Sequence, residues 1–474
     1  MKKVYTFCIG GTGIRVMKSV IMLLAAGMKT NGYEVVPVII DPHLDLEEKK
    51  RLNSLIEQYE RIQRDTVRGG KDHTLPALEG FFATPMESYE ELNGRENDAH
   101  TSFSEQRPFG EYLGLQNLSP DDINNLLVDT LFTRKSLDNR LSVGFKGNPN
   151  VGTVVLSNMM KGADWMKALT ESSTFQEGDR IFIISSIFGG TGASGYPLLE
   201  KTIREMKDAP ILSRASMGAV SVQPYFSLKN PETTGSDIDS CSFITKTKAA
   251  LSYYQDNVRS DYFYYIGDKR MDTEYENNEE VQDDKAHFVE LVAATALFDF
   301  LLQPDKDNTD KPTFMSRAIA DDQEVLDLNS MGSGYAELTK RLADLSLLNM
   351  LMGVLENEKY FPLQIERGMT TAFYQDASYK RLHDFMQLFQ VWYEELATNK
   401  RAFAPFSIVP SNQVLSSWVK GYSLQAKDDS FYLLEMIKGS NKASKAENHD
   451  NKLRHLLNFA YQAINHFTEK ITLQ

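Results

Sequence analysis

The sequence predicts an α/β fold with a parallel sheet, followed by a mainly helical C-terminal part. Short apolar runs alternate with helical patterns over about the first 310 residues, as in sheets whose strands are joined by crossover helices. Glycine-rich segments follow two of these runs, at residues 10–13 and 189–195. Beyond about Asp310, helical periodicity dominates, so the chain divides into at least two parts.

The composition is that of an ordinary soluble globular protein. The chain has 474 residues, 42% of them apolar, and a net charge of −14, which makes nucleic acid a poor default partner. Two cysteines give neither a disulfide framework nor a zinc cluster, and they fit a reducing, cytoplasmic environment. We find no apolar stretch long enough for a membrane span, and we predict no metal site built from protein side chains.

The first unit predicted is strand–glycine–helix–strand. Residues 4–9 form a buried strand, residues 10–13 a glycine loop and residues 15–28 a helix. The run EVVPVII at residues 34–40 is a second buried strand, which Asp41 and the following proline end.

A helical and irregular stretch separates this unit from the next strand. Residues 45–64 predict an amphipathic helix, and residues 71–105 are polar and irregular. A helix over 120–139 precedes a Gly- and Pro-containing loop at 144–152, and a further helix follows as far as about Leu169.

The next predicted elements complete the sheet. Strands are expected at 181–187, 218–222 and 261–266, with helices at 196–206 and 244–256 between them. A long apolar helix over 283–302 is expected to be central and buried. In the C-terminal part we expect helices at 335–356, 379–397 and 451–469, and strands only at 403–409 and 431–437. The predicted divisions are residues 1–282, 283–310 and 311–474.

The glycine segments indicate phosphate binding. A glycine loop between a strand and a helix exposes backbone N–H groups beside the positive end of the helix dipole. There is no G-x-x-x-x-G-K-[ST] motif, which argues against a Walker-type site. Residues 190–195 match G-x-G-x-x-G, and Asp41 ends the second strand as a ribose-binding acid would, so a dinucleotide-binding, Rossmann-like sheet stays open.

A third motif distinguishes these possibilities. Residues 144–152 read GFKGNPNVG, which resembles the G-x-G-x-x-N-P-x-V-G loop of the tubulin/FtsZ family of GTPases. Residues 188–194 resemble that family's G-G-G-T-G-[ST]-G loop, with Phe188 for the first glycine, Ala193 for the hydroxyl residue and Ser194 for the last glycine. Residues 10–13 stand where the family has its first glycine loop, with Ile14 in place of the usual Asn.

The resemblance covers residues 1–310 and implies a nucleotide site built from several segments. The glycine backbone would wrap the phosphates, Thr191 would donate a hydrogen bond, and the Gly147–Asn148 corner would contact the γ-phosphate directly or through Mg²⁺. Glu232 is the candidate ribose acid, Asp268 the residue that reads guanine, and Ala286 stands where the family has a base-contacting Asn. The implied nucleotide-binding residues are Gly10, Gly11, Thr12, Gly13, Asp41, Gly147, Asn148, Gly189, Gly190, Thr191, Gly192, Ala193, Ser194, Glu232, Asp268 and Ala286.

The resemblance also implies a catalytic loop. Residues 305–310 read DKDNTD, similar to the N-x-D-x-x-D of FtsZ, where acids from the next subunit assist hydrolysis. Asp307 and Asp310 would polarise the attacking water in the neighbour's site. A solvated acidic loop without a catalytic role is the competing interpretation.

These inferences predict a GTP-binding protein, with GTP or GDP and Mg²⁺ as cofactors. It would self-associate head to tail, which produces open filaments, and hydrolyse GTP at the contact between subunits. Two alternatives remain: an NAD(P)-dependent oxidoreductase on a Rossmann-like sheet, and a nucleotide-gated module that binds a partner without turnover. Other proteins could bind through the C-terminal part. GTP over ATP, and the biological process, stay open.

Overall fold

The structure is a computed structural model of the chain, and it describes most of the first 306 residues and parts of the rest. The described residues are 1–42, 47–68, 75–89, 107–119, 121–141, 145, 147–161, 163–171, 173–228, 241–268, 273–275, 285–306, 311–319, 325–326, 336–356, 369–406 and 451–468.

Strands and helices alternate along the N-terminal half, and helices predominate afterwards. In chain order the elements are β1 (Lys2–Ile9), α1 (Gly10–Ala25), β2 (Tyr33–Ile40), α2 (Glu47–Val67), α4 (Phe109–Tyr112), η1 (Leu115–Asn117), α5 (Ile123–Leu131), α6 (Arg134–Asp138), α7 (Pro149–Met160), α8 (Asp164–Thr170), β3 (Arg180–Ser186), α9 (Gly190–Arg204), α10 (Pro210–Ser213), β4 (Ser216–Val222), β5 (Ser227–Leu228), α12 (Cys241–Asn257), β6 (Tyr262–Asp268), β7 (Glu274–Tyr275), α13 (Phe288–Leu302), β8 (Thr313–Ile319), β9 (Val325–Leu326), α15 (Ala336–Leu355), α17 (Thr371–Tyr374), α18 (Ala377–Thr398), β10 (Ala402–Phe403) and α20 (Lys452–Thr468).

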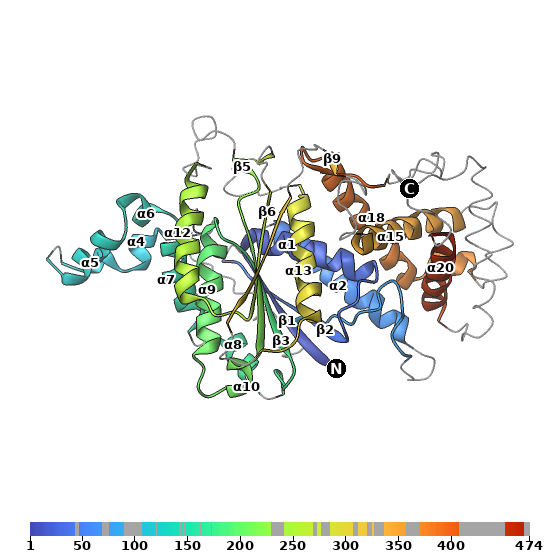
Figure 1. The fold of residues 1–474 in the computed structure, drawn as a ribbon, viewed down its shortest axis with the longest axis horizontal. Helices are drawn as coiled ribbons and strands as arrows, with labels where there is room; N and C mark the ends of the chain where they lie inside the picture. Colours follow the sequence, from blue (N-terminus) through green and yellow to red (C-terminus); the bar gives the residue numbers. More distant parts are fainter. Residues whose placement is uncertain are drawn as a thin grey trace.

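A six-stranded sheet in the order β2-β1-β3-β4-β6-β8 forms the centre of the molecule, and all its strand pairs are parallel. Helices cover both faces. In Figure 1, α9 and α12 lie on one side of the sheet, and α13 and α1 lie on the other. The helices α4, α5 and α6 project from one end of the molecule, while α15, α18 and α20 lie at the opposite end. The predicted α/β fold with a parallel sheet is therefore confirmed.

The strands predicted before residue 282 are all present, but one strand of the sheet was missed. β8 pairs with β6 at the edge of the sheet and lies in the part expected to be mainly helical. Its exposed Phe314 and Ser316 alternate with half-buried residues, so this edge strand lacks the continuous apolar run of the central strands. Of the strand expected at 403–409, the described residues as far as Phe406 contain the short strand Ala402–Phe403. Residues 407–409 and the strand expected at 431–437 lie outside the described residues.

Both glycine segments belong to helices rather than to loops before them. α1 begins at Gly10, and α9 begins at Gly190. The first turns lie very close to the preceding strands, since a Cβ on Gly13 would lie 2.8 Å from the carbonyl carbon of Cys8 and one on Gly192 would lie 2.7 Å from the Ser186 oxygen. Glycine permits this approach because it has no side chain.

Two helices expected to be continuous are each divided. The helix expected over 120–139 is interrupted between α5 and α6. Thr133 caps the second of these helices by accepting a hydrogen bond from the Ser136 N–H. The helix expected to reach Leu169 is α7 and α8. The three long C-terminal helices are confirmed as α15, α18 and α20.

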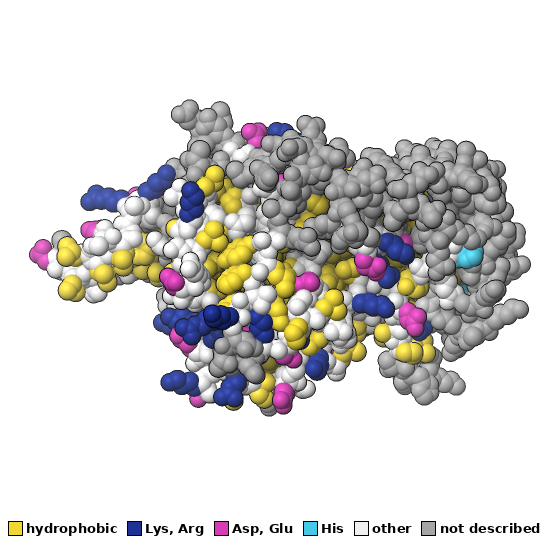
Figure 2. All heavy atoms as spheres, viewed as in Figure 1, with side chains coloured by type: hydrophobic (Ala, Val, Ile, Leu, Met, Phe, Trp, Pro, Cys, Tyr) yellow, Lys and Arg dark blue, Asp and Glu magenta, His cyan; other side chains and the backbone are white. Residues whose placement is uncertain are grey.

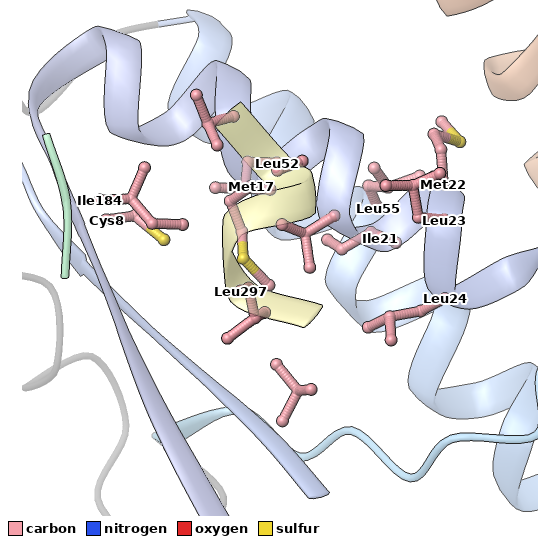
Figure 3. Packing of buried hydrophobic residues seen from close by; sticks show 14 of the residues in the cluster. Cys8, Met17, Ile21, Met22, Leu23, Leu24, Leu52, Leu55, Ile184 and Leu297 are labelled. Carbon is pink, nitrogen blue, oxygen red and sulfur yellow. The ribbon is translucent and has the colours of Figure 1, made fainter. Parts of the chain in front are cut away.

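One hydrophobic cluster runs through the molecule from β1 to α20. α1 is its centre, since every residue of that helix except Gly11 is buried. α1 packs against both α2 and α13, and Figure 3 shows its Met17 and Ile21 in the same cluster as Leu52 and Leu55 of α2 and Leu297 of α13. α13 is also buried along most of its length, as its apolar sequence predicted, but it has only 15 residues. Within the described parts of the chain, no helix has both the length and the apolar character to cross a membrane.

Candidate functional site

The glycine segments meet where the strand order of the sheet reverses. β1 lies between β2 and β3, so the chain leaves β1 towards one edge and returns at β3 towards the other. α1 starts at the carboxyl end of β1, and α9 starts just after the carboxyl end of β3. The two helices pack on opposite faces of the sheet (Figure 1). In open parallel sheets, ligands bind in the crevice at this switch point.

The glycine segments at residues 10–13 and 189–195 touch each other directly. Gly10 has a φ of +73°, which favours glycine, and a Cβ there would lie 3.3 Å from the Cβ of Thr191 and 3.4 Å from the Gly192 nitrogen. Two helix N-termini therefore converge, each with backbone N–H groups that no residue within the helix can pair. Gly11 and Thr191 are partly exposed at this point, and Thr12 is buried.

The Asn-Pro loop packs against the second glycine segment. A Cβ on Gly190 would lie 3.2 Å from the backbone nitrogens of both Gly147 and Asn148. Asn148 caps α7, accepting the Val151 N–H at 3.4 Å, and its Nδ2 donates to Ser136 Oγ at 2.7 Å. The structure thus brings together three segments that lie apart in the sequence, around Gly10, Asn148 and Gly190.

Helix α12 holds both of these segments from outside. Lys246 Nζ donates to the Gly147 carbonyl at 2.7 Å, and the Tyr254 hydroxyl donates to the Ala193 carbonyl at 3.1 Å. Sequence reasoning missed both side chains, because the contacts join residues 99 and 61 positions apart and have no local signal.

In the second glycine segment, the three positions that depart from the tubulin/FtsZ pattern are packing positions. Phe188 is buried in an aromatic cluster, with its ring centroid 5.0 Å from that of Phe243 and 5.4 Å from that of Phe226. Ser194 is buried and donates from Oγ to the Gly190 carbonyl at 2.7 Å. Ala193 is also buried. Phe188 therefore fixes the glycine segment to the core.

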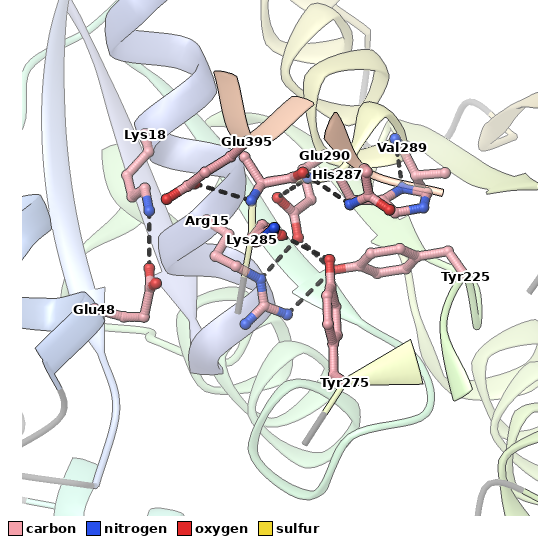
Figure 4. Close-up of polar contacts among 12 residues, drawn as sticks. Arg15, Lys18, Glu48, Tyr225, Tyr275, Lys285, His287, Val289, Glu290 and Glu395 are labelled. Atoms are coloured by element: carbon pink, nitrogen blue, oxygen red, sulfur yellow. Dashed lines mark hydrogen bonds and ion pairs between the residues drawn. The ribbon is translucent and has the colours of Figure 1, made fainter. Parts of the chain in front are cut away.

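A buried charged network lies at the start of α1 and α13 (Figure 4). Arg15 Nε donates to Glu290 Oε1 at 2.7 Å, and the Tyr225 hydroxyl donates to the same oxygen at 2.5 Å. The other carboxylate oxygen of Glu290 accepts the His287 N–H at 3.0 Å. Nearby, Lys18 pairs with Glu48 at 3.0 Å. The network connects the first glycine helix to the central helix, and no motif in the sequence predicted it.

Three predicted nucleotide contacts are buried by protein groups. Asp41 follows β2 and is buried, with a polar partner. Asp268, the last residue of β6, has a side chain with no exposed surface, and Arg401 Nε donates to its Oδ2 at 2.8 Å. Ala286 donates its N–H to Glu395 at 3.0 Å and accepts from Asn399 at 3.1 Å. The C-terminal segment thus covers the positions expected to read the base.

The remaining predicted residues, Glu232, Asp307 and Asp310, lie outside the described residues. Asp305, which begins the same acidic loop, is 63% exposed and pairs with Arg180 at 2.7 Å. Among the described residues, no group of three or more His, Cys, Asp or Glu side chains could hold a metal ion.

No protein-family model matches this chain, and no curated protein is significantly similar to it. Two helix starts, whose first N–H groups have no partner within the helix, and glycines that let a ligand approach the backbone suit phosphate oxygens.

Proposed function

We propose that this protein binds a guanine nucleotide at the convergence of α1, α9 and the Asn148–Pro149 loop. The observation that carries the proposal is the contact between these three glycine-bearing segments at the switch point of a parallel sheet. The glycines fit phosphates, and the 144–152 loop favours the tubulin/FtsZ type of site over a dinucleotide site.

We further propose head-to-tail self-association, with Asp307 and Asp310 of one subunit assisting GTP hydrolysis in the next. Mg²⁺ would be held by the phosphates and supply charge neutralisation. The burial of Asp268 and Ala286 supports a second candidate, a nucleotide-gated module without turnover, since residues expected to contact the base are engaged with the C-terminal segment.

The first test is binding of a fluorescent GTP analogue, with GTP, ATP and NAD as competitors. Gly10→Ala and Gly32→Ala form a matched pair, because both glycines have positive φ but only Gly10 lies at the site; a Cβ on Gly32 meets nothing within 4 Å. We expect Gly10→Ala to weaken GTP binding by about tenfold or more and Gly32→Ala to leave it unchanged, while each loses about 1 kcal/mol of stability. Displacement by NAD but not by GTP would overturn the proposal in favour of the oxidoreductase.

The second test measures hydrolysis and light scattering over a range of protein concentrations. Hydrolysis per subunit should rise with concentration if the active site is shared between subunits. The double variant Asp307→Ala/Asp310→Ala should retain GTP binding and lose at least about tenfold in turnover. Unchanged turnover would favour the partner-binding module.

A further inference from the structure

A cavity lies beside the second glycine segment, on the outer side of α9. Its volume is about 690 Å³, within the roughly 300–1,000 Å³ typical of small-molecule sites. Its walls come from α6, the start of α7, α9 and α12. The cavity adjoins the proposed nucleotide site and shares Gly147, Asn148, Ala193 and Ser194 with it, but its described lining includes no residue of β1, α1 or β2. It extends instead along the outer side of α9 to α6 and α12.

The charge of the cavity selects for an anion. Lys135 of α6, Lys201 of α9 and Lys246 of α12 line it, and its described lining contains no Asp or Glu. The chain as a whole has 65 acidic and 51 basic residues, so this local excess of positive charge is opposite to the overall balance. Figure 2 shows several Lys and Arg side chains over the end of the molecule that carries these helices.

The rest of the lining is suited to an apolar ring. Tyr253 is 50% exposed and lines the cavity together with Pro197, Leu198 and Ala250. A half-exposed tyrosine beside aliphatic side chains offers a flat surface on which an aromatic group can stack. Asn139, Asn148 and Thr153 add polar groups that could orient a ligand.

We propose that this cavity is a binding site for a small organic anion that carries an aromatic ring. The lysines attract the anionic group, and the ring packs between Tyr253 and the aliphatic wall. The proposal rests on the cavity's own lining and goes beyond the proposed nucleotide function, although the two sites share the Asn148–Pro149 loop. Lys246 and Asn148 belong both to this cavity and to the support of the Asn-Pro loop, so a ligand here would contact the groups that hold that loop in place.

The probe for the test is 8-anilinonaphthalene-1-sulfonate, an aromatic anion whose fluorescence rises when water is excluded, added to the full-length protein without nucleotide. We expect saturable binding at about one site per chain. Phenyl phosphate should displace the probe, whereas inorganic phosphate alone and phenol alone should displace it at least about tenfold less well, because each supplies half of the recognised chemistry.

Two matched variants locate the site. Lys201→Met and Lys248→Met each remove one exposed lysine, but only Lys201 lines the cavity; the first should weaken probe binding about three- to fivefold and the second should not. Ala249→Trp fills the cavity from an exposed helical position and should abolish binding without changing the thermal unfolding midpoint. Equal effects of the two lysine variants, wild-type binding by Ala249→Trp, or no saturable binding by the wild type would each overturn the proposal.

Discussion

At the scale of single residues, His287 shows how burial determines the properties of a side chain. It is fully buried, its Nδ1 accepts the Val289 N–H at 3.1 Å to cap α13, and its ring lies 4.9 Å from that of Tyr225. Its Nε2 has no hydrogen-bond partner in the described structure. Burial, and then the positive charges of Arg15 and Arg401, lower the pKa of His287 to about 3. His287 is thus a buried capping residue of α13, a role that no sequence pattern indicated.

This lowered pKa predicts a loss of stability in mild acid. An unfolded chain protonates His287 below about pH 6.5, whereas the folded protein does so only near pH 3. The stabilisation is therefore complete above about pH 6.5 and decreases as the pH falls towards 3, by about 2 kcal/mol at about pH 5. His287→Asn keeps a capping acceptor without a titrating group. Urea unfolding measures the free energy of unfolding at about pH 5 and about pH 7.5. The change in this free energy between the two pH values should be smaller for the variant than for the wild type, and equal changes would contradict the prediction.

At the scale of elements, the local sequence predicted most strands but not how the helices begin. Central strands such as β1 and β3 have continuous apolar runs because both their faces are covered, so they are visible in the sequence. Glycine suggested loops at 10–13 and 189–195, but the structure uses it inside α1 and α9 for close contact with neighbouring backbone. Helix propensity cannot show this, because tertiary packing compensates for the cost of glycine in a helix.

The contact between α7 and α9 gives a prediction at this scale. A Cβ on Gly152 would overlap Ser194 Oγ and lie 2.8 Å from the Phe145 ring and 3.0 Å from the Gly190 oxygen. Gly152→Ala should therefore lower the free energy of unfolding by about 1–3 kcal/mol, and by less in a Ser194→Ala background. The control is Gly353→Ala in α15, where a Cβ meets nothing within 4 Å; it should raise stability by up to about 1 kcal/mol. Urea unfolding measures all of these, and a neutral Gly152→Ala would show that α7 can move freely.

At the scale of the whole molecule, the C-terminal segment is attached to the centre of the sheet domain. α18 packs against α2, and the residues at and after its end bind β6 and the start of α13 through Arg401–Asp268, Asn399–Ala286 and Glu395–Ala286. The side chains of Arg401 and Asp268 have almost no exposed surface, and each residue also has further interactions. Breaking such a pair leaves a buried charge, which costs about 3–5 kcal/mol.

We therefore expect Arg401→Met to destabilise both the end of α18 and the start of α13. Amide hydrogen exchange should become faster in residues 286–290 as well as in the end of α18, because the same contacts order both. Lys400→Met, at an exposed neighbouring position, is the control and should leave exchange unchanged. Faster exchange in α18 alone would mean that the start of α13 is held independently of the C-terminal segment.

The sequence by itself determined the α/β class, the positions of the central strands and the three glycine-bearing segments, because apolar runs and glycines act through local conformation and burial. The tertiary structure alone decided that these segments touch at one switch point and that β8 completes the sheet. It also decided that Asp268 and Ala286 are covered by Arg401, Glu395 and Asn399. Those outcomes depend on partners that are distant in the sequence, whose contacts form only when the chain packs and leave no pattern in the local sequence.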